Sequence, residues 1–151
     1  MIVPVYNVAS YLPKALDSVL SQTLGEIEVI AVDDGSTDGS GEILDQYAGQ
    51  DKRMRVIHKA NAGYGHSVNV GLESAVGEYV GILEPDDWMQ LDMLSFLYEA
   101  AEKYQAELVR ADYAVFYETG QGDEISNRKE KKKKKLYGRV CNPQELEREL
   151  F

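Results

Sequence analysis

The sequence has little cysteine and no long apolar run. Its single cysteine, Cys141, cannot form a disulfide within the chain, so the sequence favours a reducing, cytoplasmic location. No apolar stretch approaches the roughly 18 to 20 residues that a membrane-spanning helix needs. Met1 leads directly into residues 2–5 rather than into a basic and then apolar leader, so we expect no export signal.

Positive charge is also scarce. The chain has 16 Lys and Arg against 26 Asp and Glu, a net charge of −10, which argues against a nucleic-acid partner. The exception is the segment 128–135, which holds seven basic residues and one glutamate. We interpret it as a solvated loop; the alternative is peripheral contact with the anionic inner face of a membrane, or with a charged acceptor.

Three motifs of phosphate-handling enzymes are missing. The absence of Gly-Lys-Ser/Thr excludes a P-loop. The first strand lacks a glycine-rich turn after it, and Gly63-x-Gly65 has Val68 where a third glycine would stand, which excludes a dinucleotide-dependent oxidoreductase. Val32 occupies the place of the first acid that a phosphoaspartyl hydrolase needs.

What the sequence does contain is a regular alternation of strands and helices. Apolar runs predict strands at residues 2–5, 27–32, 53–58, 79–83 and about 108–117. Helical spacing predicts helices between them, with Ser10 and either Thr37 or Asp38 as N-caps, Pro13 in a first turn and Gly77 as a stop. Right-handed crossovers then imply an α/β fold with a mainly parallel sheet and helices on both faces. We expect the strand at 79–83 to be buried on both faces.

The sequence after this alternation is polar. Residues 118–135 contain glycine and the basic segment, and are predicted to form a loop. Asn142 and Pro143 then resemble the start of a helix that runs to the chain end. We therefore divide the chain into a domain at 1–117, a lysine-rich linker at 118–141 and an incomplete helical region at 142–151.

Two acidic clusters directly follow predicted strands. Asp33-Asp34 and residues 84–87 come at the carboxyl ends of parallel strands, so we expect both at the same edge of the sheet, where ligands bind. The alternative for each cluster is that it only caps the next helix. Adjacent Asp86 and Asp87 repel one another unless a cation or hydrogen bonds compensate. Mg²⁺ or Mn²⁺ needs only one or two carboxylates when substrate phosphates complete its shell.

Six segments in order carry a resemblance. They are Ile2-Val3-Pro4-Val5-Tyr6-Asn7, Leu20-Ser21-Gln22-Thr23, residues 32–38, Asn61-Ala62-Gly63 with Asn69, Gly77-Glu78-Tyr79-Val80, and Glu84-Pro85-Asp86-Asp87-Trp88. Together they resemble the family 2 glycosyltransferases over about residues 2–105. The resemblance implies a Rossmann-like GT-A fold, a three-layer sandwich around the parallel sheet.

The resemblance also implies a site. Pro4 and Tyr6 match a turn that contacts the nucleotide, and the base could stack on Tyr6, for which a packed core tyrosine is the alternative. Asp34, with Asp33 beside it, matches an acid that accepts a hydrogen bond from the base. The implied nucleotide-sugar-binding residues are Pro4, Tyr6, Asp33, Asp34, Gly63, Asn69 and Asp86. The implied ligands of Mn²⁺ or Mg²⁺ are Asp86 and Asp87.

The sequence departs from the family pattern at two positions. Glu84 replaces the usual first aspartate of the acidic motif, so its role as a metal ligand is left open. Val68 replaces the arginine that commonly precedes the matching asparagine, which removes one positive contact to the nucleotide. His58 and His66 are interpreted as structural or surface residues, with His66 the better functional candidate because it adjoins the glycine-bearing loop.

The implied activity is inverting, metal-dependent transfer of a sugar from a nucleotide-diphosphate sugar, expected to be a UDP-sugar, to a glycan or lipid-linked acceptor in polysaccharide biosynthesis. In the family the catalytic base comes from a segment well downstream of the acidic motif. We therefore assign no base and expect the chain to be a fragment. The alternative is a non-catalytic module that binds a nucleotide sugar or a partner enzyme.

Overall fold

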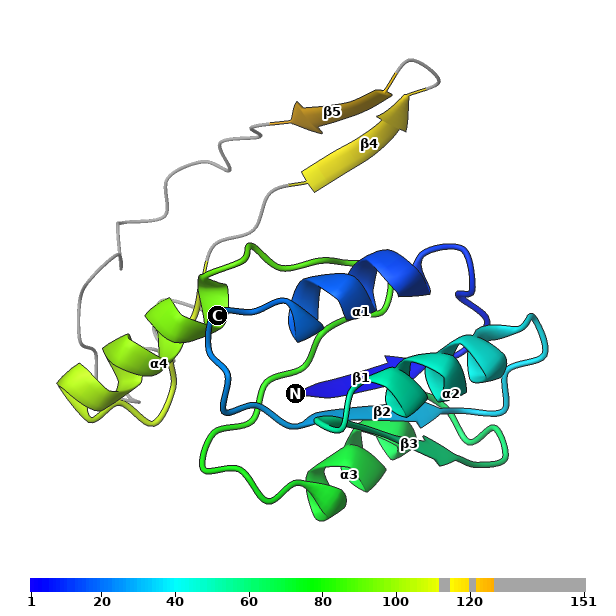
Figure 1. The fold of residues 1–151 in the computed structure, drawn as a ribbon, viewed down its shortest axis with the longest axis horizontal. Helices are drawn as coiled ribbons and strands as arrows, with labels where there is room; N and C mark the ends of the chain where they lie inside the picture. Colours follow the sequence, from blue (N-terminus) through cyan, green and yellow to red (C-terminus); the bar gives the residue numbers. More distant parts are fainter. Residues whose placement is uncertain (112–114, 120–121, 127–151) are drawn as a thin grey trace. The chain divides into compact units, whose positions relative to one another are not determined.

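The computed structural model describes residues 1–111, 115–119 and 122–126. The chain divides into two compact units, Met1–Phe96 and Leu97–Phe151. The first unit contains three strands and three helices (Figure 1). In chain order they are β1 (Ile2–Val5), α1 (Leu12–Leu20), β2 (Val29–Asp33), α2 (Ser40–Gln50), β3 (Met54–His58) and α3 (Tyr64–Ser74). Helix α4 (Met93–Tyr104) spans the boundary between the units.

The sheet of the first unit is parallel, with the strand order β1-β2-β3. β1 and β2 are buried and largely β-branched, which suits a pleated surface covered on both faces. The register pairs Val5 with Asp33, and Asp33 with His58. All three strands therefore end at the same level, and the residues that follow them share one edge of the sheet.

Helices cover both faces of this sheet. Alternate strand residues such as Val3 and Ala31 form one core with the apolar sides of α1 and α2, including Leu16 and Leu44. Helix α3 contacts β1 and β2, and Figure 1 shows it on the side of the sheet opposite α1. A Cβ atom at Gly71 of α3 would lie 2.5 Å from Ile2 Cγ2, so only glycine lets this helix approach β1 so closely. The predicted three-layer arrangement is confirmed.

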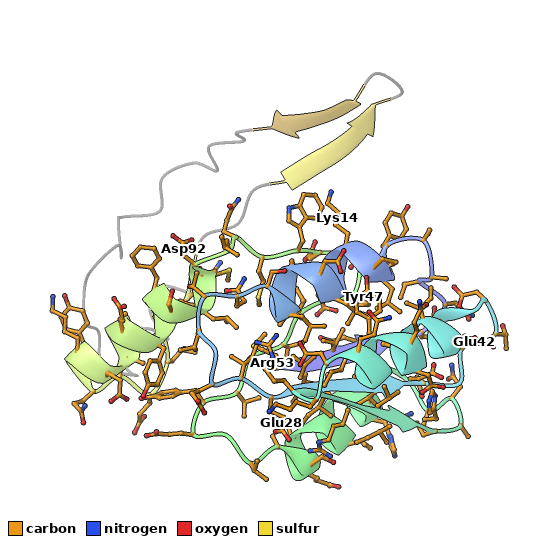
Figure 2. The ribbon with its side chains drawn as sticks, in the orientation of Figure 1. Lys14, Glu28, Glu42, Tyr47, Arg53 and Asp92 are labelled. Atoms are coloured by element: carbon orange, nitrogen blue, oxygen red, sulfur yellow. The ribbon has the colours of Figure 1, made fainter. Side chains whose placement is uncertain are left out.

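Polar contacts join α1 to α2 and to the loop before β3. The Tyr47 hydroxyl donates to Asp17 Oδ1 at 2.8 Å, and Figure 2 shows Tyr47 on the side of α2 that faces α1. The carboxylate of Asp17 and burial together raise the pKa of Tyr47 to about 12, with burial the larger cause. Arg53, directly before β3, donates to the Leu20 carbonyl and to Asp51 at 2.6 Å each. These bonds tie the carboxyl end of α1 to the loop before β3.

The structure confirms the predicted helices in the first unit, with changes at their ends. Pro13 lies in the first turn of α1, as expected, but the N-cap is Tyr11 and makes no side-chain capping bond, so Ser10 is not a cap. Asp38 accepts hydrogen bonds from the Ser40 backbone and hydroxyl, although the N-cap itself is Gly39. Helix α3 ends at Ser74, three residues before Gly77.

The strand predicted at 79–83 is wrong. The segment forms only an isolated bridge between Ile82 and Ile2, in which the Ile2 and Leu83 amides donate at 2.8 and 2.9 Å. Nor is it buried on both faces, because Tyr79, Val80 and Ile82 are 41–46% exposed. An apolar run shows that a segment suits a sheet, whereas a strand exists only where a partner strand supplies successive hydrogen bonds.

The predictions for the second unit need two corrections. The strand predicted at 108–117 does not include 108–111, and instead β4 runs from Val115 to Thr119. The predicted polar loop contains a strand, β5 (Gly122–Ser126), which pairs with β4 in antiparallel register. Its polar sequence hides the strand, because the pairing uses backbone groups that composition does not reveal. The basic segment at 128–135, Cys141 and the helix expected at 142–151 lie outside the described residues.

Candidate functional site

The site begins where β1, β2 and β3 end. Residues following β1 and β2 bond to each other: the Asn7 amide donates to Ser36 Oγ at 3.1 Å, and Asn7 Oδ1 accepts from the Thr37 amide at 2.8 Å. Asn7 adopts a positive φ of 52°, which asparagine tolerates better than most residues. Gly35 has a φ of 74°, and a Cβ there would lie 3.0 Å from the Asn61 amide nitrogen. Glycine at this position lets the three loops pack together.

Asp34 is the centre of this edge. Its side chain accepts hydrogen bonds from the Ala62 and Gly63 amides, both at 2.8 Å, and pairs with the Lys59 ammonium. The residue is only 3% exposed. Burial opposes ionisation, but the hydrogen bonds from Lys59, Ala62 and Gly63 hold the pKa of Asp34 below its ordinary value. Asp34 therefore carries a fixed negative charge and shapes the loop at 60–63.

A pocket of about 250 Å³ opens beside Asp34. It is lined by Pro4, Val5, Tyr6, Asp34, Asn61, Gly63, Tyr64 and Ser67. Four of the residues implied by the resemblance, Pro4, Tyr6, Asp34 and Gly63, are thus brought together. Tyr6 is 51% exposed, so it is not the packed core tyrosine of the alternative interpretation. The pocket therefore presents the ring of Tyr6, the carboxylate of Asp34 and the side-chain amide of Asn61 to one ligand.

Asp33 and Asn69 are not part of the pocket lining. Asp33 points toward α2: it accepts from the Ser36 amide and contacts His58 Nδ1, both at 2.9 Å. Asn69 is exposed on α3. The roles predicted for these two residues in nucleotide binding stay predictions.

His58 and His66 have different surroundings. His58 lies between two carboxylates, with Nδ1 at 2.9 Å from Asp33 and Nε2 at 3.1 Å from Asp45 of α2. The hydrogen bond to Asp33, followed by that to Asp45, raises the pKa of His58. This contact joins β3 to α2 and agrees with a structural role. His66 is exposed in the first turns of α3.

The acidic stretch at 84–87 forms a turn, in which the Asp87 amide donates to the Glu84 carbonyl at 3.0 Å. Asp86 and Asp87 are exposed. Loss of solvent around its carboxyl, followed by repulsion from Asp86, raises the pKa of Asp87. Such a pair gains from a bound cation, so its chemistry fits a divalent metal ion. In the residues that the structure describes, however, no three Asp, Glu, His or Cys side chains gather into a metal site.

Glu84 does not line the pocket but bonds to a residue that does. It accepts a hydrogen bond of 2.5 Å from the hydroxyl of Tyr64, whose ring lines the pocket. This bond is the largest cause that raises the pKa of Tyr64 to about 12, so the hydroxyl is a donor at neutral pH. Tyr64 is a site residue that the motifs alone did not identify, although its place directly after Gly63 in a matched motif could have indicated it.

The chain after the acidic turn is anchored to α1. The Met89 amide donates to Ser18 Oγ at 3.1 Å, and the Lys14 ammonium lies 3.3 Å from the centre of the Trp88 ring. The amide group of Gln22, 5% exposed, donates to the Gln90 carbonyl at 2.7 Å and accepts from the Leu94 amide at 2.9 Å. Gln22 stands in a matched motif, yet only the fold shows that it bonds to residues 68 and 72 positions away. These hydrogen bonds hold the segment that follows the acidic turn in place.

The fold and the site define a class of protein. The family model described as glycosyl transferase family 2 matches residues 1–147. The chain therefore belongs to glycosyltransferase family 2, and its α/β sandwich is of the GT-A type. The resemblance found in the sequence is confirmed.

Individual relatives agree with this assignment. Glycosyltransferase GlyA of Streptococcus pneumoniae is 43% identical over 119 residues, which cover 79% of this chain and 17% of that protein. The crystal structure of S. aureus TarS in complex with UDP-GlcNAc matches with a TM-score of 0.65 and 31% identity, over 69% of this chain and 31% of that one. The mannosyltransferase PcManGT from Pyrobaculum calidifontis, in complex with GDP-Man and Mn²⁺, matches with a TM-score of 0.54 and 30% identity, over 58% and 27%.

This chain thus spans less than a third of the length of each of these three proteins. Among the helices that the structure describes, none combines the length and apolar character needed to cross a bilayer.

Proposed function

We propose that the pocket binds the nucleoside part of a nucleotide-diphosphate sugar, and that the diphosphate extends toward Asp86 and Asp87. The observation that carries this proposal is the clustering of Tyr6, Asp34 and Gly63 around one pocket in a chain of this family. A base can stack on the exposed ring of Tyr6. Asp34 is held ionised and can accept an N–H of the base through its remaining lone pairs.

Asp86 and Asp87 are the residues that would hold a divalent metal ion, Mn²⁺ or Mg²⁺. Two carboxylates suffice when diphosphate oxygens complete the coordination shell. A bound ion supplies positive charge that stabilises the departing nucleoside diphosphate. Two observations support this: the two adjacent, exposed carboxylates of Asp86 and Asp87, and the Mn²⁺ in the related mannosyltransferase structure.

The proposed reaction is transfer of the sugar to a hydroxyl of a glycan or lipid-linked acceptor, with inversion at the anomeric carbon, in polysaccharide biosynthesis. UDP is the proposed nucleotide, supported by the UDP-GlcNAc bound to TarS, and GDP is its alternative because GDP-Man is bound to the mannosyltransferase. The cytoplasmic location, and membrane contact by residues 128–135, stay predictions.

The decisive experiment is calorimetric titration of the chain with UDP and with GDP, each with and without Mn²⁺. We expect UDP to bind more tightly with Mn²⁺. Asp87→Asn should remove at least about tenfold of that gain, or about 1.4 kcal/mol, while leaving the fold intact. Asp92→Asn, which changes an exposed acid five positions away on the same segment, is the matched control and should bind like the wild type (Figure 2).

The same preparation separates transfer from binding alone. UDP release from a UDP-sugar in the presence of Mn²⁺ would support an enzyme, whereas UDP binding without any turnover would favour the non-catalytic module. Absence of UDP and GDP binding would contradict both, and an unchanged Asp87→Asn variant would remove Asp87 from the site.

A further inference from the structure

Tyr64 belongs to the pocket and to the acidic stretch at once. Its ring lines the pocket, and its hydroxyl donates to Glu84 Oε1 at 2.5 Å. The two residues are 20 positions apart and come from different segments, the first turn of α3 and the chain before the acidic turn. This side chain therefore connects the part of the site that would hold the base with the part that would hold the diphosphate.

The tyrosine end of this connection is fixed by Asp34. The Gly63 amide donates to Asp34 Oδ2 at 2.8 Å, and the Gly63 carbonyl accepts from the Ser67 amide at 3.2 Å in the first turn of α3. The backbone directly before Tyr64 is thus held by a buried carboxylate. A side chain that leaves such a backbone has few directions open to it, because its χ1 rotamers are limited by the helix.

The glutamate end is equally constrained. Leu83, directly before Glu84, is 4% exposed, and its amide donates to the Ile2 carbonyl at 2.9 Å. On the other side, the Glu84 carbonyl accepts from the Asp87 amide and closes the acidic turn. Glu84 therefore lies between a backbone pinned to β1 and the two exposed aspartates.

We propose that Tyr64 and Glu84 form a positioning pair that sets the acidic turn at a fixed distance from the pocket. Glu84 is then a hydrogen-bond acceptor for Tyr64 rather than a metal ligand, which assigns a role to the residue that departs from the family motif. The extra methylene of glutamate gives the carboxylate its reach to the tyrosine. This inference rests on the proposed function and specifies how its two halves are held together.

The test measures UDP affinity by calorimetry with and without Mn²⁺. Tyr64→Phe keeps the ring in the pocket but removes the hydroxyl. We expect its metal-free affinity to stay within about twofold of the wild type, since the ring that lines the pocket is retained, and its Mn²⁺-dependent gain to fall by about tenfold. Tyr11→Phe, which changes another half-exposed tyrosine, is the matched control and should leave both values unchanged.

Two substitutions of Glu84 distinguish a positioning residue from a metal ligand. Glu84→Gln keeps the side-chain length and an oxygen that accepts from Tyr64, so it should retain most of the Mn²⁺-dependent gain. Glu84→Asp keeps the charge but shortens the side chain, so it should lose as much as Tyr64→Phe does. A direct metal ligand predicts the reverse order, because aspartate can coordinate the ion and a neutral amide binds it weakly.

The results have clear consequences. If the wild type binds UDP and Tyr64→Phe keeps the full Mn²⁺-dependent gain, the positioning pair is overturned and the proposed function stands. The same holds if Glu84→Asp keeps more of that gain than Glu84→Gln. Equal losses with and without Mn²⁺ in Tyr64→Phe also overturn it, because the hydroxyl would then act at the base. Absence of UDP binding by the wild type overturns both. Thermal unfolding of each variant confirms that the fold is kept.

Discussion

The two acidic pairs of this chain follow the same sequence logic but have opposite surroundings. Asp33 and Asp34 are 5% and 3% exposed, and each accepts backbone hydrogen bonds and faces a basic side chain. Asp86 and Asp87 are exposed on a turn, where each carboxylate has the other as a neighbour. The pKa values respond accordingly: those of the first pair are lowered and that of Asp87 is raised.

This difference separates two uses of a carboxylate. A buried carboxylate is tolerated only when donors compensate for the lost water, so Asp33 and Asp34 stabilise the loops around the pocket. An exposed carboxylate beside another one costs little in stability and retains its capacity to bind a cation. The first pair should therefore govern folding, and the second should govern metal-dependent binding.

The largest expected effect on stability is at Asp34. Asp34→Ala removes the acceptor of the Ala62 and Gly63 amides, and leaves the mostly buried Lys59 ammonium with the Ala60 carbonyl but no carboxylate. We expect the free energy of unfolding to fall by about 3 kcal/mol, measured by urea denaturation. Asp87→Asn is the matched comparison and should change it by less than about 0.5 kcal/mol. Equal losses in the two variants would show that the pairs do not differ in the way described.

The next largest effect on stability is expected at Gln22, which anchors the segment after Asp86 and Asp87. Gln22→Ala removes the buried amide that bonds to the Gln90 carbonyl and the Leu94 amide, so we expect a loss of about 2 kcal/mol in unfolding free energy. Gln22→Glu has nearly the same shape but places an acceptor against the Ser18 and Gln90 carbonyls, and should be at least as destabilising. A variant with wild-type stability would show that the acidic turn does not depend on this anchor.

The smallest effect is a pH dependence at the first pair. The pKa of His58 is raised by Asp33 and Asp45, so its contribution to stability is fully present below the unfolded-state pKa of about 6.5 and is lost as pH rises through the higher folded-state value. Its side chain is 46% exposed, so we expect the contribution to be below about 1 kcal/mol. Urea denaturation at about pH 5.5 and about pH 8.5 should show this loss in the wild type but not in His58→Gln. The same loss in the variant would exclude His58 as its source.

Much of the first unit was predictable from local pattern. The apolar runs placed β1, β2 and β3 within two residues of their observed starts, because strands of a parallel sheet carry apolar residues where they face the core. The ordered motifs also identified Pro4, Tyr6, Asp34 and Gly63, which the fold brings to one pocket. Side-chain direction was less accessible: the neighbours Asp33 and Asp34 point to different surroundings, since successive strand residues face opposite sides of the sheet.

By itself, the sequence determined the family and the alternation of strands and helices over residues 2–74, because periodicity and motif order are local properties of the chain. Only the tertiary structure decided that residues 79–83 form a single bridge, that Gln22 anchors the chain beyond the acidic turn, and that Glu84 accepts from Tyr64. Each of these depends on a hydrogen-bond partner that is distant in sequence. The packing of the sheet and helices decides which groups come within hydrogen-bonding distance, and the local sequence around a residue does not.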